Sequence, residues 1–200
     1  HSKPVIFVIN RAGKEHSKTV EVLKSVQERF GIKAVPVQIP VNPGVGFSKI
    51  IDLVTMKEYT YKPDGNGKGT AAEISGDMAS SAAELHEKLV EAAAESDDTL
   101  MEKFFESGLT PEEFSRGIKE GILNKSLIPI LFTDAYSNVG TDLLLKFITD
   151  SAPSTADVPA VIAKKSGADV EIKAVQDAPL VMQVFKTIVE QHIGEFSLFK

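Results

Sequence analysis

Residues 4–9 read Pro4-Val5-Ile6-Phe7-Val8-Ile9, an apolar run that is typical of a strand buried on both faces of a sheet. A polar loop follows at residues 10–14. Apolar residues then recur at helical spacing over residues 20–30, where a glycine ends the pattern. Residues 34–39 form a second apolar run. This order of strand, helix and strand predicts a βαβ unit with parallel pairing and a right-handed crossover, and therefore an α/β fold.

The sequence pattern changes from residue 44 onward. Strands are predicted at residues 48–54 and 57–61, and a glycine-rich turn at residues 63–69. A long amphipathic helix is predicted over about residues 77–106, because its apolar and acidic residues fall on opposite faces at the 3.6-residue period. These elements predict an α+β insert within the α/β unit.

The α/β pattern returns after a second predicted helix. Residues 110–113 read Thr-Pro-Glu-Glu, which favours a helix start with an N-cap and a capping box. Residues 127–132 are predicted to form a strand. Pro129 counts against a central strand, but a helix would tolerate it no better. A further helix is predicted at residues 143–150.

Alternating segments follow a linker at residues 151–154. They lie at residues 171–175, 181–189 and 196–199, and they predict antiparallel strands. They end before a barrel or sandwich could close. Because an unpaired strand leaves an unprotected sheet edge, the chain is expected to be a fragment of a longer protein.

Composition excludes several kinds of site. The 200 residues contain no cysteine, so disulfides, thiolate nucleophiles and cysteine metal sites are absent. The formal net charge of -6 argues against generic nucleic-acid binding by this segment. No apolar stretch approaches the roughly 20 residues of a membrane span, so no membrane association and a cytoplasmic location are expected. The histidines show neither metal-ligand spacing nor a paired nucleophile, so no metal site is expected.

The loop Asn10-Arg11-Ala12-Gly13 resembles the Asn-Lys-x-Asp guanine-recognition motif of GTPases, directly after a buried strand as in that motif. Together with the rest of the chain, in collinear order, it resembles the elongation factor G family of translational GTPases. The long acidic insert favours this family over ribosomal protection proteins and peptide-release GTPases. The other matching segments are residues 35–41, 46–47, 51–57, 85–95, 100–104, 128–130, 134–140, 152–159, 185–187 and 194–199.

This resemblance implies a domain organisation. Residues 1–43 and 124–153 would form the C-terminal half of a GTPase G domain, a partial P-loop GTPase with a Rossmann-like, mostly parallel sheet. Residues 44–123 would form the α+β insert, called the G′ subdomain. Residues 154–176 would be a linker, and residues 177–200 the first strands of the β-barrel domain II.

The resemblance also implies a cofactor-binding site in two loops, with residues Asn10, Arg11, Gly13, Asp134, Ala135 and Tyr136. In the family, the asparagine of the first loop braces the site, the lysine packs on the guanine, and the aspartate accepts hydrogen bonds from N1 and N2. The alanine N–H of the second loop reaches O6. GTP or GDP with Mg²⁺ is therefore the cofactor expected for the intact parent protein.

Two positions depart from the family pattern. Gly13 stands where the family has the base-reading aspartate, so two charge-assisted hydrogen bonds, each worth about 1.5–3 kcal/mol, are missing. Asp134 stands where the second loop of the family has serine. Either Asp134 supplies the missing carboxylate from the other loop, or both changes mark a factor that no longer binds or hydrolyses GTP well.

The resemblance implies that the family's phosphate-binding loop, switch segments and catalytic histidine would all precede His1. No catalytic residue is therefore expected here, and no cofactor for this chain alone. Residues 65–70 resemble a phosphate loop only superficially, because Lys62 holds the place of its first glycine and Gly69 follows its lysine.

The acidic face of the long predicted helix has two interpretations. It is either a solvated face or, as in the family, the surface that docks on the ribosomal stalk protein of the large subunit. The partner-binding residues would be Glu84, Glu87, Glu91 and Glu95. The leading hypothesis is a ribosomal translocation factor. The alternatives are a ribosome-binding paralogue that has lost GTP hydrolysis and a nucleotide-dependent metabolic enzyme.

Overall fold

A computed structural model describes residues 3–63 and 65–199. Asp64, part of the predicted turn at residues 63–69, lies outside the described residues. The chain divides into two compact units, His1–Pro153 and Ser154–Lys200. The first unit combines a parallel sheet with an antiparallel sheet and is therefore of mixed α/β class, as predicted.

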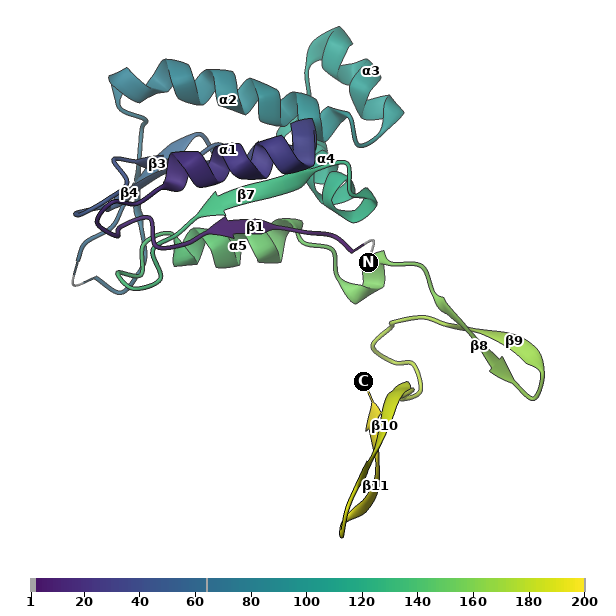
Figure 1. Ribbon diagram of the computed structural model, residues 1–200. Coiled ribbons are helices and arrows are strands. Elements are labelled where there is room, and N and C mark those ends of the chain that lie inside the picture. Colours follow the sequence, from purple (N-terminus) through teal and green to yellow (C-terminus); the bar gives the residue numbers. More distant parts are fainter. Residues whose placement is uncertain (1–2, 64, 200) are drawn as a thin grey trace. The chain divides into compact units, whose positions relative to one another are not determined.

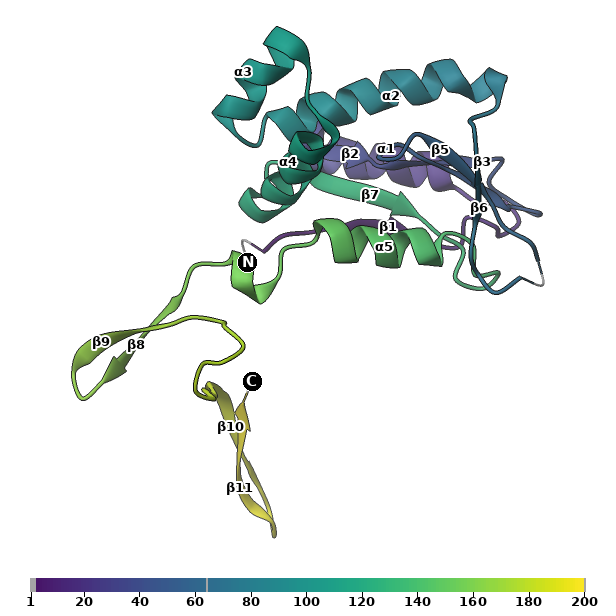
Figure 2. The same ribbon diagram turned by 180° about the vertical axis from the view of Figure 1, so that it is seen from behind.

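The parallel sheet has the order β1-β7-β2, with β1 at Phe7–Ile9, β7 at Ile128–Phe132 and β2 at Ala34–Pro36 (β1 and β7 are labelled in Figure 1, and all three strands in Figure 2). Parallel pairing is confirmed, since both outer strands run parallel to β7. However, β1 and β2 are not neighbours as the βαβ prediction implied. A strand from the far side of the insert lies between them.

Helices cover both faces of this sheet. α1 (Thr19–Phe30) packs Leu23 and Val26 against a cluster that contains Ile130 and Phe132. α5 (Thr141–Ser151) and α4 (Pro111–Asn124) lie on the other face, where Leu131 belongs to the main core cluster (Figure 2). This alternation along β7 follows from the two-residue period of a strand.

The predicted strand at residues 34–39 is wrong in one respect, because it is two strands in two sheets. β2 ends at Pro36, and β3 (Gln38–Val41) begins the antiparallel sheet. Val37 bridges the two sheets, because its N–H donates to Ile130 and its carbonyl accepts from Leu53, each at 3.0 Å. The buried Gln38 side chain accepts from the Phe132 N–H at 3.0 Å. It satisfies that donor of β7 where the parallel ladder stops.

Pro129 is compatible with its central strand because of its position in the register. The pairing of β1 with β7 starts at Phe7 and Ile130, one residue after Pro129. Alternate residues of a parallel strand direct their N–H groups to opposite neighbours. Ile130 bonds toward β2 and Thr133 toward β1. Pro129 therefore lacks its N–H on the side of β7 that faces β1, at a point where β1 has not yet begun. No hydrogen bond between β1 and β7 is lost.

The antiparallel sheet has the order β3-β4-β5-β6. β4 (Lys49–Asp52) and β5 (Lys57–Thr60) correspond to predicted strands, whereas β6 (Thr70–Ala72) follows the glycine-rich turn and was not predicted. The ammonium of Lys49 lies 2.6 Å from the buried carboxylate of Glu58 and holds the pKa of that carboxyl below its ordinary value.

The single helix predicted at residues 77–106 is wrong, because the structure has two helices there. α2 (Gly76–Ala94) stops before residues 95–97, and α3 (Asp98–Ser107) begins after them. The Asp97 carboxylate caps α3 by accepting from the N–H groups of Thr99 and Leu100, which ends one helix and starts the next. The capping box of Thr110 and Glu113 is confirmed at the start of α4.

The second unit holds two β-hairpins after a short 3₁₀ turn, η2 (Thr155–Asp157). The first pairs β8 (Val161–Lys165) with β9 (Ala168–Ile172), and the second pairs β10 (Val184–Glu190) with β11 (Gly194–Phe199). Antiparallel pairing is confirmed, although β8 was not predicted. The segment at residues 154–176 thus contains a hairpin, and the domain boundaries themselves stay predictions.

Candidate functional site

The two loops singled out from the sequence lie side by side. β1 and β7 are parallel neighbours, so the loops that follow them meet at one edge of the sheet. Backbone hydrogen bonds join them, since the Thr133 N–H donates to Ile9 and the Ala12 N–H donates to Thr133, at 3.0 and 3.1 Å. The structure therefore brings together all the residues predicted for this site, which are Asn10, Arg11, Gly13, Asp134, Ala135 and Tyr136.

The Asn10 side chain braces both loops. Its Oδ1 accepts from the Arg11 N–H at 2.7 Å, from the Thr133 hydroxyl at 3.2 Å and from the Ala135 N–H at 3.1 Å. The Ala135 N–H, which the family resemblance assigns to a ligand carbonyl, therefore already has an acceptor. A ligand at this place would share or displace that hydrogen bond.

Gly13 and Asp134 occupy complementary space. A Cβ added to Gly13 would lie 2.4 Å from Oδ2 and 3.2 Å from Cγ of Asp134. The carboxylate of the second loop thus takes the space that a side chain at position 13 would need. Asp134 is only 7% exposed, and the Ser137 hydroxyl donates to its Oδ2 at 2.6 Å. A glycine at position 13 is what leaves room for this carboxylate.

Exposed groups lie on the same two loops as this buried carboxylate. Asn10, Arg11 and Ala135 are exposed, and the Tyr136 side chain is 97% exposed. A guanidinium and an aromatic ring are both able to pack on the face of a planar ligand. The arrangement combines a hydrogen-bond acceptor with accessible stacking groups.

Sequence reasoning missed two residues that hold this site. Thr133 and Ser137 donate to Asn10 and Asp134, respectively. The spacing of Ser137, three residues after Asp134, is a local side-chain hydrogen-bonding pattern that could have indicated it. Thr133 gave no such signal, because its partner lies far away in the sequence.

A second connection, the Asp142 clip, joins the antiparallel sheet to the start of α5. It comprises Tyr61, whose hydroxyl donates to the Asp142 carboxylate at 2.6 Å, and Gly69, whose N–H donates to it at 2.9 Å. Burial of the Tyr61 side chain raises the pKa of its hydroxyl above the ordinary value. The hydrogen bond to the Asp142 carboxylate raises this pKa further, as the second-largest cause. The phenol therefore stays protonated and remains a donor at neutral pH.

We expect Tyr61→Phe to destabilise the first unit. The variant removes a hydrogen bond to a carboxylate, which is worth about 1.5–3 kcal/mol. Urea unfolding of the chain, followed by far-UV circular dichroism of the helices, measures the loss. Tyr59→Phe, two residues earlier and outside the clip, is the matched control. An equal loss in the two variants would show that the clip contributes nothing.

The acidic residues of α2 lie on a different part of the unit. Glu84, Glu87, Glu91 and Glu95 are all exposed. In Figure 1, α2 runs toward α3, away from the edge at which β1 and β7 end. The structure therefore does not bring these four glutamates to the loop site.

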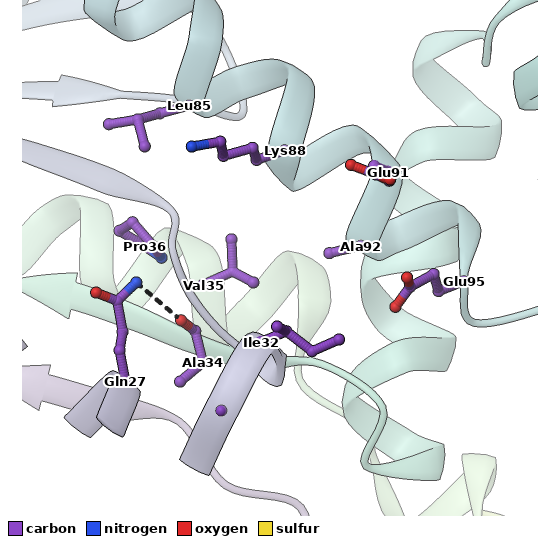
Figure 3. A pocket seen from close by; sticks show the side chains of 11 residues that line it. Gln27, Ile32, Ala34, Val35, Pro36, Leu85, Lys88, Glu91, Ala92 and Glu95 are labelled. Carbon is purple, nitrogen blue, oxygen red and sulfur yellow. Dashed lines mark hydrogen bonds between the residues drawn. The ribbon is translucent and has the colours of Figure 1, made fainter. Parts of the chain in front are cut away.

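Two of these glutamates border an apolar groove of about 620 Å³ (Figure 3). Val35 and Pro36 of β2 line one wall, Leu85 and Ala92 of α2 line the other, and Glu91 and Glu95 lie at the end toward α3. A second hollow, of about 460 Å³, is lined by Glu84, Glu87, Lys88, Glu91 and Phe104. Both hollows combine apolar and acidic groups, and Lys88 lines both of them.

The β2 edge beside the groove is closed to an added strand. The Ala34 carbonyl accepts from the Gln27 side chain at 3.3 Å, and the Ala34 N–H donates to Gly31 in η1 (Gly31–Lys33). Pro36 has no N–H. The groove is therefore suited to side chains of a partner rather than to its backbone.

In the part of the chain that the structure describes, no group of three or more histidines, aspartates and glutamates could hold a metal ion. None of the helices at residues 3–63 and 65–199 is long and apolar enough to span a bilayer.

Comparison with known proteins identifies relatives along the whole chain. No family model matches. An elongation factor G-like protein of Thermotoga maritima is 29% identical over 199 residues, which cover 99% of this chain and 28% of that protein. Elongation factor G 2 of Syntrophomonas wolfei is 30% identical over 98% of this chain and 29% of its own length.

A solved structure has the same fold. The crystal structure of a protein from Thermus thermophilus superimposes with a TM-score of 0.70 at 22% identity, over 98% of this chain and 27% of that one. The chain thus spans less than a third of the proteins that it matches. The resemblance inferred from the residues is confirmed: over 98–99% of its length, this chain is similar to proteins named as elongation factor G or elongation factor G-like.

Proposed function

We propose that this chain is part of a ribosome-associated translation elongation factor that works in the cytoplasm. The observation that carries the proposal is the similarity to elongation factor G relatives over nearly the whole chain. In this proposal, the first unit is the C-terminal half of a P-loop GTPase domain with its insert. Residues 177–200 are the beginning of a β-barrel domain, after a linker at residues 154–176.

The loop site would bind the base of GTP or GDP. Three features support this: the two loops meet at the carboxyl ends of parallel strands, Asn10 braces both, and Arg11 and Tyr136 are exposed beside them. The phosphate cradle and the Mg²⁺ ligands would come from other parts of a longer protein. GTP hydrolysis by the full-length gene product, with and without ribosomes, tests the proposal. Ribosome-stimulated turnover is expected, and no turnover in either condition would count against it.

The α2 surface would dock on the stalk protein of the large ribosomal subunit. Exposed Glu84, Glu87, Glu91 and Glu95 supply negative charge, and the neighbouring groove supplies apolar contact area. A partner with basic residues around an apolar side chain would match both.

We expect the charge reversal Glu91→Lys with Glu95→Lys to slow association with ribosomes. Steering by opposite charges raises association rates, and salt screens it over about 10 Å at 0.1 M. The rate should fall by roughly tenfold or more at low salt and by less at high salt. Stopped-flow mixing of the full-length protein with ribosomes measures it.

Glu21→Lys with Glu28→Lys, on exposed positions of α1, is the control with the same change in net charge. Equal slowing by both pairs would mean that net charge alone matters, and that α2 is only a solvated face.

A second candidate is a ribosome-binding paralogue that has lost GTP hydrolysis. Gly13 favours it, because the carboxylate of the family motif is missing there. The existing hydrogen bond of the Ala135 N–H also favours it. Ribosome binding without nucleotide turnover in the experiment above would select this candidate.

A further inference from the structure

We infer that Asp134 is the residue that determines base specificity, and that it reads the guanine edge from the second loop in place of the absent aspartate of the first. The inference deepens the proposed function and rests on its nucleotide site.

The Asp134 carboxylate lies beside the backbone of Gly13. Oδ2 of Asp134 lies 2.4 Å from where a Cβ of residue 13 would be. A side chain grown from position 13 and the side chain of Asp134 would therefore enter the same space. A carboxylate from the second loop therefore occupies the space in which a side chain of residue 13 would begin.

Hydrogen bonds hold this carboxylate and its loop in place. The Ser137 hydroxyl donates to Oδ2 at 2.6 Å. The Asp134 backbone pairs with Val139 through hydrogen bonds of 2.9 and 3.0 Å, and the next residue, Ala135, bonds to Asn10. A fixed acceptor loses little freedom when a ligand binds, which suits it to recognition.

The Asp134 carboxylate is chemically complementary to the N–H donors of guanine. A carboxylate only accepts hydrogen bonds, and it can take two parallel donors. Guanine presents such a pair in its N1–H and its 2-amino group. Adenine presents an acceptor at N1, which would face the carboxylate unfavourably. A carboxylate on the same pair of loops as exposed Arg11 and Tyr136 would thus select a planar base with two adjacent N–H donors.

The test is a change of base preference. Asp134→Asn keeps the shape of the side chain and its acceptor for Ser137, but replaces one acceptor by an N–H₂ donor. Xanthine differs from guanine by a carbonyl in place of the 2-amino group. In the full-length gene product, titrated with GDP, XDP and ADP, we expect Asp134→Asn to bind GDP about 10-fold to 100-fold more weakly and to prefer XDP.

Glu15→Gln, an exposed carboxylate-to-amide change close to the first loop, is the control and should retain the preference for GDP. A wild type that selects GDP and an Asp134→Asn variant with unchanged selectivity would overturn the inference while leaving the proposed nucleotide site standing. A wild type that binds none of the three nucleotides would overturn both. A switch from GDP to XDP in the variant alone supports the inference, because a brace without base contact cannot produce it.

Discussion

Gly13→Asp should destabilise the first unit, and adding Asp134→Ser in the same chain should restore most of the loss. A side chain at position 13 would place its Cβ 2.4 Å from Oδ2 of Asp134, and a second carboxylate would stand beside the first. Overpacking alone costs about 1–3 kcal/mol, and like charges in a partly buried place add to it. A total of about 2–4 kcal/mol is therefore expected for the single variant.

The measurement is a double-mutant cycle by urea unfolding. Asp134→Ser alone is the second single variant, and it leaves the space beside Gly13 unfilled. The double variant has the aspartate and serine arrangement that the family resemblance implies. If the two effects simply add, the contact between the loops does not explain why residue 13 is glycine.

Gly117→Ala should also destabilise the first unit, against the intrinsic preference of a helix. Alanine is favoured over glycine within helices by about 1 kcal/mol. At position 117, however, the new Cβ would lie 2.6 Å from the carbonyl oxygen of Ala93 and 3.0 Å from its carbon. These are backbone atoms of α2, so α4 would have to move away from α2. We expect a net loss of about 1–3 kcal/mol.

Gly76→Ala is the matched control, because nothing lies within 4 Å of a Cβ at that position of α2. It should leave the free energy of unfolding within about 0.5 kcal/mol of the starting chain. Thermal or urea unfolding followed at the helical signal compares the two. A stabilising Gly117→Ala would show that the helices adjust at no cost.

Sequence patterns predicted elements well where local chemistry decided them. Residues 110–113 formed the expected capping box, because its hydrogen bonds join residues three positions apart. The periodicity of residues 20–30 likewise predicted α1. The predicted long helix was wrong, because apolar residues recur at helical spacing on both sides of Glu95, Ser96 and Asp97, while the Asp97 cap interrupts the backbone there. Periodicity reports which side chains are buried and does not report where a backbone breaks.

The candidate site was predictable in part. The order of motifs along the chain indicated which loops to examine, and the parallel pairing of β1 with β7 brings them together. The roles of Thr133 and Tyr61 could not be predicted, because their partners are distant in sequence. The split of residues 34–39 also required the structure, since an apolar run does not indicate which sheet each half joins.

The sequence by itself determined the α/β class, the similarity to proteins of the elongation factor G family and the residue types at positions 13 and 134. These depend on residue type and order, which are properties of the chain. Only the tertiary structure decided that the Asp134 carboxylate fills the space beside Gly13. Contact between residues so far apart depends on strand order and register, which many distant residues set together.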